Sequence, residues 1–413
     1  MAGTLPAGAP GPEGERLDIL AAAPLPYRLG GREHFQLGGC LYCATLLSGL
    51  SRLGHRVRAL ASAPRPKELG QPESNGSGVQ VEWFALDFRS AATPPPEPYV
   101  RRERARYEAA LDRALAERRP DLVVLGSESQ AWYCVEACRE RGLPTVLIAH
   151  GVPSAALATG IYPPWAVDAL LGHLRRVDLV VAVARHLEDA LRSYGVTSVR
   201  AVPTGFDTAM FAPAGRDPAL LELVGIGPDR VVVGSFSHLR PEKRVLDLVA
   251  SIEPASRSDP RLLYLIVGDG PGLQEAVDRA TASGLGDRVR FVGELEHDRV
   301  PAYMSLCDVV VLASEREGSS LVCREAQASG RALLVSDIPA GRETIGDPPA
   351  GLLFRLGDPG DLAAKTVELA RDAALRARLA TNGWKAAQAY TEEHWVRAVS
   401  AALVETARSR RAG

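Results

Sequence analysis

ASEREGSSLVCREAQASG, residues 313–330, follows a short apolar run at residues 308–312. The apolar run is typical of a buried parallel strand, and residues 321–329 predict a short helix that a glycine closes. Strand, loop and helix in this order indicate an α/β fold with a parallel sheet. Glu317 then lies on the loop and Glu325 on the helix.

The helix start carries the first chemical signal. Glu325 falls on the same face as the apolar Leu321 and Val322, where a carboxylate needs a partner. Ser319 and Ser320 supply N-cap residues at a helix terminus whose free N–H groups favour an anion such as phosphate. Taken alone, the two acids are equally compatible with a structural reading, a solvated loop acid and an ion-paired core acid.

Outward from this stretch, the chain repeats the same pattern of apolar run, loop and helix in two series. The first series of expected strands comprises residues 17–23, 56–62, 80–86, 121–127, 144–150, 178–184 and 198–202. The second comprises residues 230–236, 262–267, 289–293, 308–313, 332–336 and 351–354. Such alternation predicts two Rossmann-like, doubly wound α/β domains that face a cleft.

The domain boundaries follow from changes in composition. We expect a flexible tail at 1–16, an N-terminal domain at 17–206, an interdomain connection at 207–229, a C-terminal domain at 230–390 and a helix at 391–413 returning to the N-terminal domain. The first sixteen residues have neither the basic start nor the apolar segment of a signal peptide. A chain of 413 residues is long enough for two cores.

Composition narrows the class of partner. With 46% hydrophobic and 24% charged residues and no long uncharged apolar run, the chain is expected to be a cytoplasmic protein. A net charge of −2 argues against nucleic acid as the main partner. Only four lysines stand among the 48 basic residues, which indicates a GC-rich and hence bacterial coding genome.

An arginine-rich run and a set of cysteines are both interpreted as structural features and not as binding sites. Four arginines interleave with two glutamates in a pattern typical of a solvated helix face, which limits membrane contact to a peripheral one: Arg101, Arg102, Arg104, Arg106, Glu103 and Glu108. Four cysteines stand at helical spacings and favour reduced, buried thiols over a zinc site: Cys40, Cys43, Cys134 and Cys138. No metal site is expected.

In the first series, two places attract attention. Gly38 and Gly39 precede a predicted helix at residues 41–53, where a glycine pair lets backbone approach a phosphate; Gly30-Gly31 competes for this role, and a plain turn is the alternative. His150 ends a buried strand. Ligands gather at the carboxyl ends of strands in doubly wound domains, although a lone histidine is also often structural.

In the second series, SHLRPEKR at residues 237–244 follows the first strand and places Arg240, Lys243 and Arg244 together. Such cations suit a diphosphate, and an ordinary solvated charge run is the alternative. The glycine turn after the next strand contains Gly268, and Glu294 follows the strand after that. Both turns are candidates for lining a nucleotide-base pocket.

Together these motifs resemble the family 4 retaining glycosyltransferases of the GT-B fold, from Leu17 to Arg408. The matching pieces occur in family order: Gly38-Gly39, 53–57, 202–207, 240–243, 266–271, 317–325 and 351–358. The specific element is the pair of glutamates separated by seven residues, because a lone glycine turn is common.

The resemblance implies a hexosyltransferase that takes a nucleotide-diphosphate sugar as donor and an unidentified hydroxyl acceptor, with no metal and no other cofactor. Glu325 would bind the donor ribose, Glu317 the sugar hydroxyls, and His150 the sugar. The remaining implied contacts are to the donor diphosphate, from Lys243 and the backbone of Ser319, Ser320 and Leu321. The leaving phosphate would deprotonate the acceptor.

Departures from the family pattern keep rivals open. His238 stands where the family often has an arginine, so Arg240 or Arg244 would substitute, and Ser319-Ser320 replace an aromatic residue and a glycine. A GT-B nucleotide-sugar epimerase and a catalytically silent nucleotide-binding GT-B protein are therefore the alternatives. Donor base, sugar, acceptor and oligomeric state are left open by the sequence.

Overall fold

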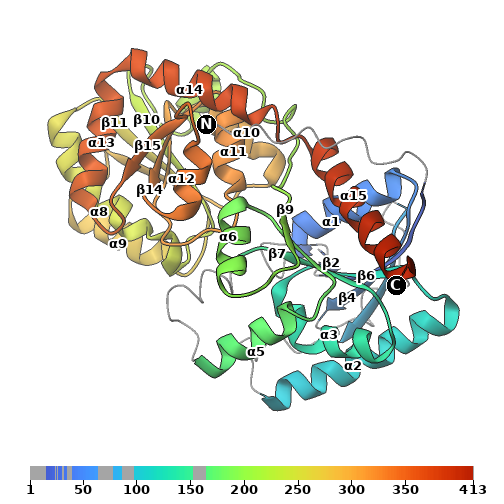
Figure 1. Ribbon diagram of the computed structural model, residues 1–413. Coiled ribbons are helices and arrows are strands. Elements are labelled where there is room, and N and C mark those ends of the chain that lie inside the picture. The colour runs from blue at the N-terminus through green and yellow to red at the C-terminus, as the bar shows by residue number, and fades with distance from the viewer. Residues whose placement is uncertain are drawn as a thin grey trace. The chain divides into compact units, whose positions relative to one another are not determined.

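The computed structural model describes residues 15–23, 25, 27–29, 32–34, 40–63, 78–85, 97–151 and 164–412. These residues form two compact units (Figure 1). Among the described residues, the C-terminal unit is Thr204–Glu392, and the N-terminal unit combines those up to Pro203 with those from Glu393 onward.

The N-terminal unit contains a seven-stranded parallel sheet of order β5-β4-β1-β6-β7-β8-β9. Its strands are β1 Asp18–Ala23, β4 Arg56–Ala63, β5 Gln80–Ala85, β6 Leu122–Leu125, β7 Thr145–Ala149, β8 Leu179–Ala182 and β9 Val199–Ala201. A separate antiparallel pair is β2 Tyr27–Leu29 and β3 Arg32–His34. Its helices are α1 Cys40–Arg52, α2 Glu97–Glu117, α3 Ala131–Glu140, α5 Pro164–Leu174, α6 Arg185–Ser193 and α15 Glu392–Ala412.

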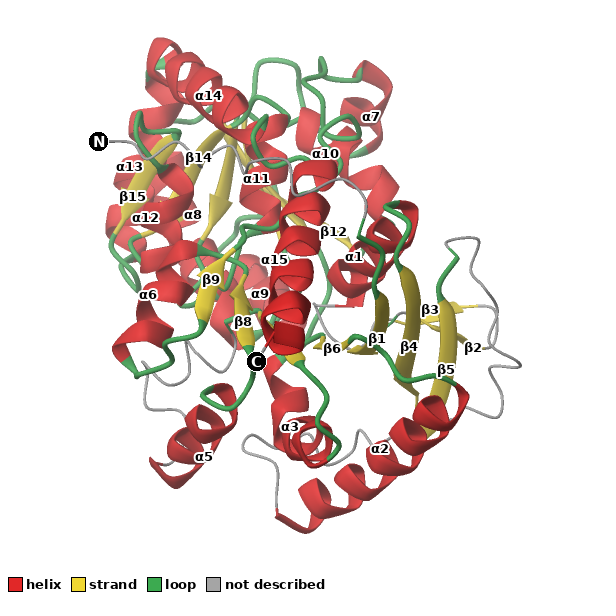
Figure 2. Cartoon of the chain, turned by 45° about the vertical axis from the view of Figure 1, so that its right-hand side comes forward, coloured by secondary structure: helices red, strands yellow, loops and turns green. Residues whose placement is uncertain are grey.

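The C-terminal unit contains a six-stranded parallel sheet of order β12-β11-β10-β13-β14-β15 (Figure 2). Its strands are β10 Val231–Phe236, β11 Leu262–Val267, β12 Val289–Gly293, β13 Val309–Leu312, β14 Ala332–Ser336 and β15 Gly351–Phe354. Its helices are α7 Pro218–Leu223, α8 Val245–Ser258, α9 Leu273–Ala282, α10 Val300–Ser305, α11 Leu321–Ala328, α12 Pro339–Ile345, α13 Pro359–Arg371 and α14 Ala373–Ala387. The predicted doubly wound α/β class is confirmed.

Alternate residues of the C-terminal strands enter two different cores. Val231 and Val233 pack with α8, α9 and α13, whereas Val232 packs with α10 and α11 on the other face. Successive side chains of a strand point to opposite faces, so a sheet covered on both sides needs apolar residues at every position. This is why the strands of both units read as continuous apolar runs.

Residues 207–229 lie inside the C-terminal unit. We expected this segment to be an interdomain connection, but it carries apolar side chains that pack into the core of the unit: Phe211, Leu220, Leu221 and Ile226. The chain passes between the units at Pro203–Thr204 and again at Glu392–Glu393.

Helix α15 packs in the N-terminal unit, beside α1 (Figures 1 and 2). Its apolar face, Trp395, Val396, Val399 and Leu403, belongs to the core of that unit. Val396 approaches α1 so closely that a side chain at Gly49 would meet it at 2.6 Å.

The solvated face expected for the arginine run is wrong for Glu103. This residue is fully buried in α2, and its Oε1 accepts hydrogen bonds from Arg102 at 2.9 Å and Arg106 at 3.0 Å. The reason is that α2 turns this face, with Tyr107 and Leu111, inward.

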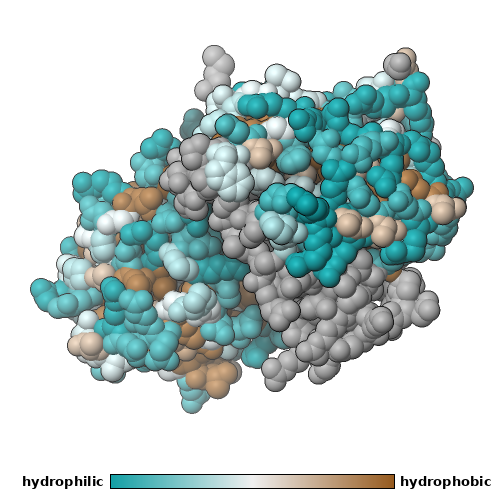
Figure 3. Space-filling view, turned by 90° about the horizontal axis from the view of Figure 1, so that it is seen from below, coloured by the Kyte–Doolittle hydropathy of each residue, from teal (hydrophilic) through white to brown (hydrophobic). Residues whose placement is uncertain are grey.

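None of the described helices combines the length and the apolar character required to cross a membrane. On the face in Figure 3, hydrophobic residues form small groups among hydrophilic ones.

Candidate functional site

Two loops of the C-terminal unit leave the sheet at its topological switch point. Strands β10 and β13 are neighbours, with Gly234 beside Val310, and the chain continues from them in opposite directions across the sheet. Ligands of doubly wound sheets bind outside the carboxyl ends of the strands at such a point. The loops are residues 237–244 and 313–320, and they carry Lys243 and Glu317 respectively.

Lys243 and Glu317 contact each other directly. The Lys243 Nζ donates to Glu317 Oε1 at 2.5 Å, and the Ser314 hydroxyl donates to the same oxygen at 2.6 Å. Their side chains are 22% and 11% exposed, so the pair is largely removed from solvent. The structure thus brings together two residues to which the family resemblance gives diphosphate and sugar roles, and it makes each the counter-ion of the other.

Other contacts tie the two loops together. The Glu315 N–H donates to the Glu242 carbonyl at 2.9 Å, and Arg244 Nη1 lies 3.5 Å from Glu315 Oε2. Arg316 lies between Glu315, at 3.3 Å, and Glu242, at 4.0 Å. The loops therefore form one charged platform in which cations and carboxylates alternate.

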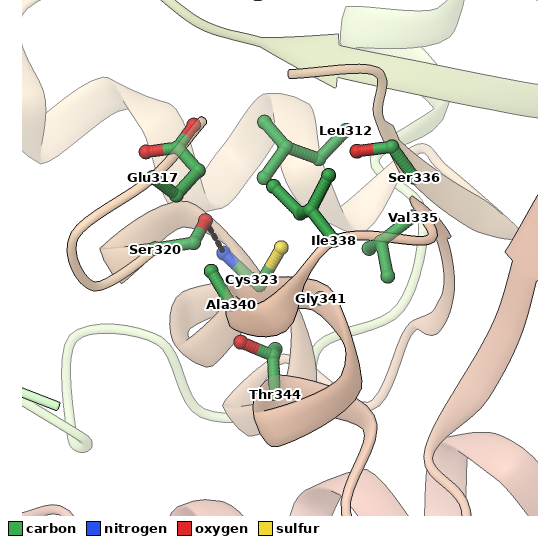
Figure 4. A pocket seen from close by; sticks show the side chains of 10 residues that line it. All are labelled: Leu312, Glu317, Ser320, Cys323, Val335, Ser336, Ile338, Ala340, Gly341 and Thr344. Atoms are coloured by element: carbon green, nitrogen blue, oxygen red, sulfur yellow. Dashed lines mark hydrogen bonds between the residues drawn. The ribbon is translucent and has the colours of Figure 1, made fainter. Parts of the chain in front are cut away.

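Helix α11 begins at this platform. Ser320 is its N-cap, and its hydroxyl oxygen accepts from the Cys323 N–H at 3.3 Å. Figure 4 shows Glu317, Ser320 and Cys323 lining a small pocket that is otherwise largely apolar. Ser320 is buried and Ser319 half-buried. The Ser320 hydroxyl thus serves the helix as a cap, which gives this departure from the family pattern a local structural role.

Glu325 has a partner that the sequence analysis missed. His297 Nε2 lies 3.2 Å from Glu325 Oε1, and Glu325 is 5% exposed. The hydrogen bond to Glu325 raises the pKa of His297 above its ordinary value, against the opposing effect of burial. His297 lies between Glu296 and Asp298, 28 positions before Glu325, and this spacing offers no pattern that would have revealed the contact.

The glycine turn after β11 lies against the loop after β10. Gly268 has a φ of +129°, and a Cβ there would fall 1.9 Å from the Ser237 carbonyl oxygen, so only glycine fits. The Gly268 N–H donates to the Gly293 carbonyl at 2.7 Å, which brings the segment before Glu294 to the same edge. Glu294, His238 and Arg240 are exposed there.

His150 lies at the carboxyl end of β7 in the N-terminal unit. Its Nε2 donates to the Gly126 carbonyl at 2.9 Å, and its ring meets that of Tyr42 edge-on at 4.5 Å. Burial lowers the pKa of His150, although the nearby Glu128 carboxylate acts in the opposite direction. Gly38 and Gly39 lie outside the described residues, as does the competing pair Gly30-Gly31.

The cysteines are buried thiols where the structure describes them. Cys43, Cys134 and Cys138 are buried and form no disulfide, and burial raises the pKa of Cys138 to about 11. Within the described ranges, no group of three or more histidine, cysteine or acidic side chains is arranged to hold a metal ion.

Comparison with known proteins places the chain. The model of Glycosyltransferase Family 4 matches residues 38–210, and that of Glycosyl transferases group 1 matches residues 222–386. The GDP-mannose-dependent alpha-mannosyltransferase of Mycobacterium tuberculosis is 32% identical over 323 residues, 76% of this chain and 79% of that protein. The D-inositol 3-phosphate glycosyltransferase of Nocardia farcinica is 32% identical over 286 residues, 64% of this chain, and the match spans only 62% of that relative's length.

Solved structures share the fold at lower identity. Sucrose-phosphate synthase from Thermosynechococcus elongatus has a TM-score of 0.76 at 19% identity, covering 95% of this chain and 99% of that one. Anabaena HepE, solved in complex with UDP and glucose, has a TM-score of 0.72 at 20% identity, covering 94% and 100%. Two doubly wound parallel-sheet units define the GT-B class of proteins. Within that class, the chain belongs to glycosyltransferase family 4, the group 1 glycosyl transferases.

Proposed function

We propose that the protein is a retaining glycosyltransferase that moves a hexose-type sugar from a nucleotide-diphosphate sugar to an acceptor hydroxyl without a bound metal. The observation that carries the proposal is the meeting of Lys243 and Glu317 at the switch point, beside the start of α11. A cation and a helix N-terminus together suit a diphosphate. Family membership and the transferase names of the relatives favour transfer over epimerisation.

The roles follow the chemistry of each group. In the proposed reaction, the bond from the anomeric carbon to the diphosphate oxygen breaks, and the acceptor oxygen bonds to the same face. The acceptor proton passes to the leaving diphosphate. Lys243 and the N–H groups at the start of α11 stabilise the charge on the departing diphosphate, which is why no metal is needed. Arg240 and His238 are further proposed diphosphate contacts.

Glu317 and Glu325 have different proposed partners. Glu317 binds hydroxyls of the transferred sugar, and Glu325 binds the ribose, held in place by His297. Gly268 and Glu294 are proposed to line the base, and His150 to meet a substrate hydroxyl. HepE was solved with UDP-glucose, and the mycobacterial relative is named for GDP-mannose, so uridine and guanosine donors come first among those to test.

A donor panel tests the proposal. Thermal unfolding is followed with UDP-, GDP-, ADP- and dTDP-sugars, because a ligand of the folded state raises its apparent stability. The donor that binds is then incubated with acceptor sugars, inositols and aminocyclitols, with and without EDTA, and the anomeric configuration of the product is read by NMR. Retention and insensitivity to EDTA are expected.

Three outcomes would contradict parts of this proposal. Conversion of the donor sugar without acceptor would indicate an epimerase. Donor binding without turnover on any acceptor would favour a silent nucleotide-binding protein. Binding that survives in Lys243→Met as well as in the control Lys365→Met, which removes an ion-paired lysine from the surface of α13, would remove Lys243 from the site.

A further inference from the structure

The turns after β6 and β7 brace each other through two reciprocal hydrogen bonds. The strands are neighbours, with Leu125 beside Leu147, so their carboxyl ends lie together. From β7, the His150 side chain reaches the Gly126 carbonyl at 2.9 Å. From the turn after β6, the Glu128 Oε1 accepts from the Gly151 N–H at 2.7 Å. Each turn therefore supplies one side chain to the backbone of the other.

This arrangement determines which nitrogen of His150 carries the proton. A backbone carbonyl can only accept, so the Nε2 that contacts Gly126 must be the donor. In the neutral imidazole, Nδ1 is then the acceptor nitrogen. His150 in this form offers a hydroxyl group of a substrate an acceptor and not a donor.

Glu128 is a buried acidic residue, which is unusual in a protein interior. It is 1% exposed, and a buried carboxylate persists only where its hydrogen bonds and charge are compensated. Gly151, whose amide it holds, has a φ of +88°, so the chain turns sharply immediately after His150. A carboxylate that holds this turn also determines the direction in which the imidazole leaves the strand.

We propose that Glu128 is a positioning residue: it holds the Gly151 amide and thereby fixes His150 as the Nε2–H form, with Nδ1 directed to accept from a substrate hydroxyl. This inference rests on the proposed function only in assigning the hydroxyl to a substrate. The brace itself is a property of the N-terminal unit.

Aromatic packing supports the same orientation. Tyr42 of α1 meets His150 edge-on, and Trp395 of α15 packs on Tyr42 with ring centroids 4.6 Å apart. The described titratable groups around His150 are Glu128, Tyr42 and Cys43, whose Sγ lies 3.5 Å from the Gly126 carbonyl. Burial raises the pKa of Tyr42, so its phenol stays neutral, and Glu128 is the group whose charge acts on His150.

The charge of Glu128 has a predictable effect on titration. Burial lowers the pKa of His150, and the carboxylate opposes this by favouring the imidazolium. Because Nδ1 accepts only in the neutral imidazole, activity should fall as the pH drops through the pKa of His150. Removal of the carboxylate charge should move that acid limb to lower pH.

Nitrogen-15 NMR of the histidine rings in the full-length protein tests the proposal. In the wild type, Nε2 of His150 should carry the proton at neutral pH, a result that needs no variant. In Glu128→Gln, the amide oxygen can still accept from Gly151, so the tautomer should persist while the pKa of His150 and the acid limb of kcat/KM move to lower pH. Glu128→Ala should lower kcat and leave nucleoside-diphosphate affinity unchanged.

Glu136→Gln is the matched control. Glu136 lies 3.9 Å from Nδ1 of His173, whose pKa burial also lowers, and His173 packs edge-on against Trp132. This variant should shift the titration of His173 and not that of His150. A proton on Nδ1 of His150 in the wild type overturns the proposal, as does an unchanged His150 titration in Glu128→Gln. If the NMR results hold and no sugar is transferred, the brace stands and the proposed function falls.

Discussion

The carboxyl edges of the two sheets are built in contrasting ways. In the C-terminal unit, the edge is a platform of ion pairs centred on Lys243 and Glu317, and every residue of it comes from one stretch of chain, 204–392. In the N-terminal unit, the edge is held by hydrogen bonds between turns and by aromatic packing on Tyr42. Part of that packing comes from Trp395, which lies near the far end of the chain.

The contrast follows from what each edge is proposed to bind. A diphosphate carries charge, so its site needs cations, and those cations need carboxylates while no ligand is bound. A hydroxyl group is neutral, so its site needs one correctly oriented acceptor. Orientation is provided by packing and hydrogen bonds, which makes the N-terminal edge dependent on the integrity of its core.

The largest expected effect is on that core. Trp395 is 3% exposed, and Trp395→Ala should lower the free energy of unfolding of the N-terminal unit by about 3 to 5 kcal/mol. Chemical denaturation followed by tyrosine and tryptophan fluorescence measures the loss. The control is Trp384→Ala in the C-terminal unit, where the side chain is 41% exposed and should matter much less. Equal losses in the two variants would remove α15 from its supporting role.

The second effect separates the two members of the ion pair. Lys243→Met should weaken nucleoside-diphosphate binding by about 1.5 to 3 kcal/mol, the value of a hydrogen bond to a charged group. Glu317→Gln should instead strengthen binding, because the phosphate no longer competes with Glu317 for the ammonium, while turnover falls through loss of the sugar contact. Isothermal calorimetry and initial rates measure both. Weaker nucleotide binding in Glu317→Gln would show that the phosphate does not compete with Glu317 for the Lys243 ammonium.

The smallest expected effect concerns Glu325 and the histidine that it contacts, His297. Since Glu325 raises the pKa of His297, their contribution to stability is complete below the ordinary histidine pKa of about 6.5 and is lost as the pH rises through the raised value. His297 is half exposed, so we expect less than about 1 kcal/mol. Urea denaturation of wild type and His297→Gln across this pH range should show a difference that shrinks as the pH rises. A constant difference would contradict the assignment.

The sequence predicted the strands and the positions of Lys243 and Glu317 because both depend on local order. Strands covered on both faces read as apolar runs, and the loops that follow neighbouring strands meet at the switch point. The side-chain partners of the site residues could not be predicted in this way. The contacts of Glu325 with His297, and of Tyr42 with Trp395, depend on how distant segments approach, which periodicity does not report.

Glu128 lies between these cases. An acidic residue directly after the strand expected at residues 121–127 was visible in the sequence, but its role emerged only with the Gly151 amide at 2.7 Å. The burial of Glu103 was missed for a related reason, since the charge pattern of α2 does not show that the helix turns this acid inward among its own arginines.

The placement of α15 also has a consequence for biosynthesis. The ribosome releases residues up to Pro203 long before it reaches Trp395, Val396, Val399 and Leu403, which complete the N-terminal core. The described C-terminal unit comes from one continuous stretch of chain, so it can fold as soon as Glu392 emerges. The N-terminal unit therefore stays incompletely packed while the C-terminal unit is synthesised, and its core is completed only when residues 395–407 have been made.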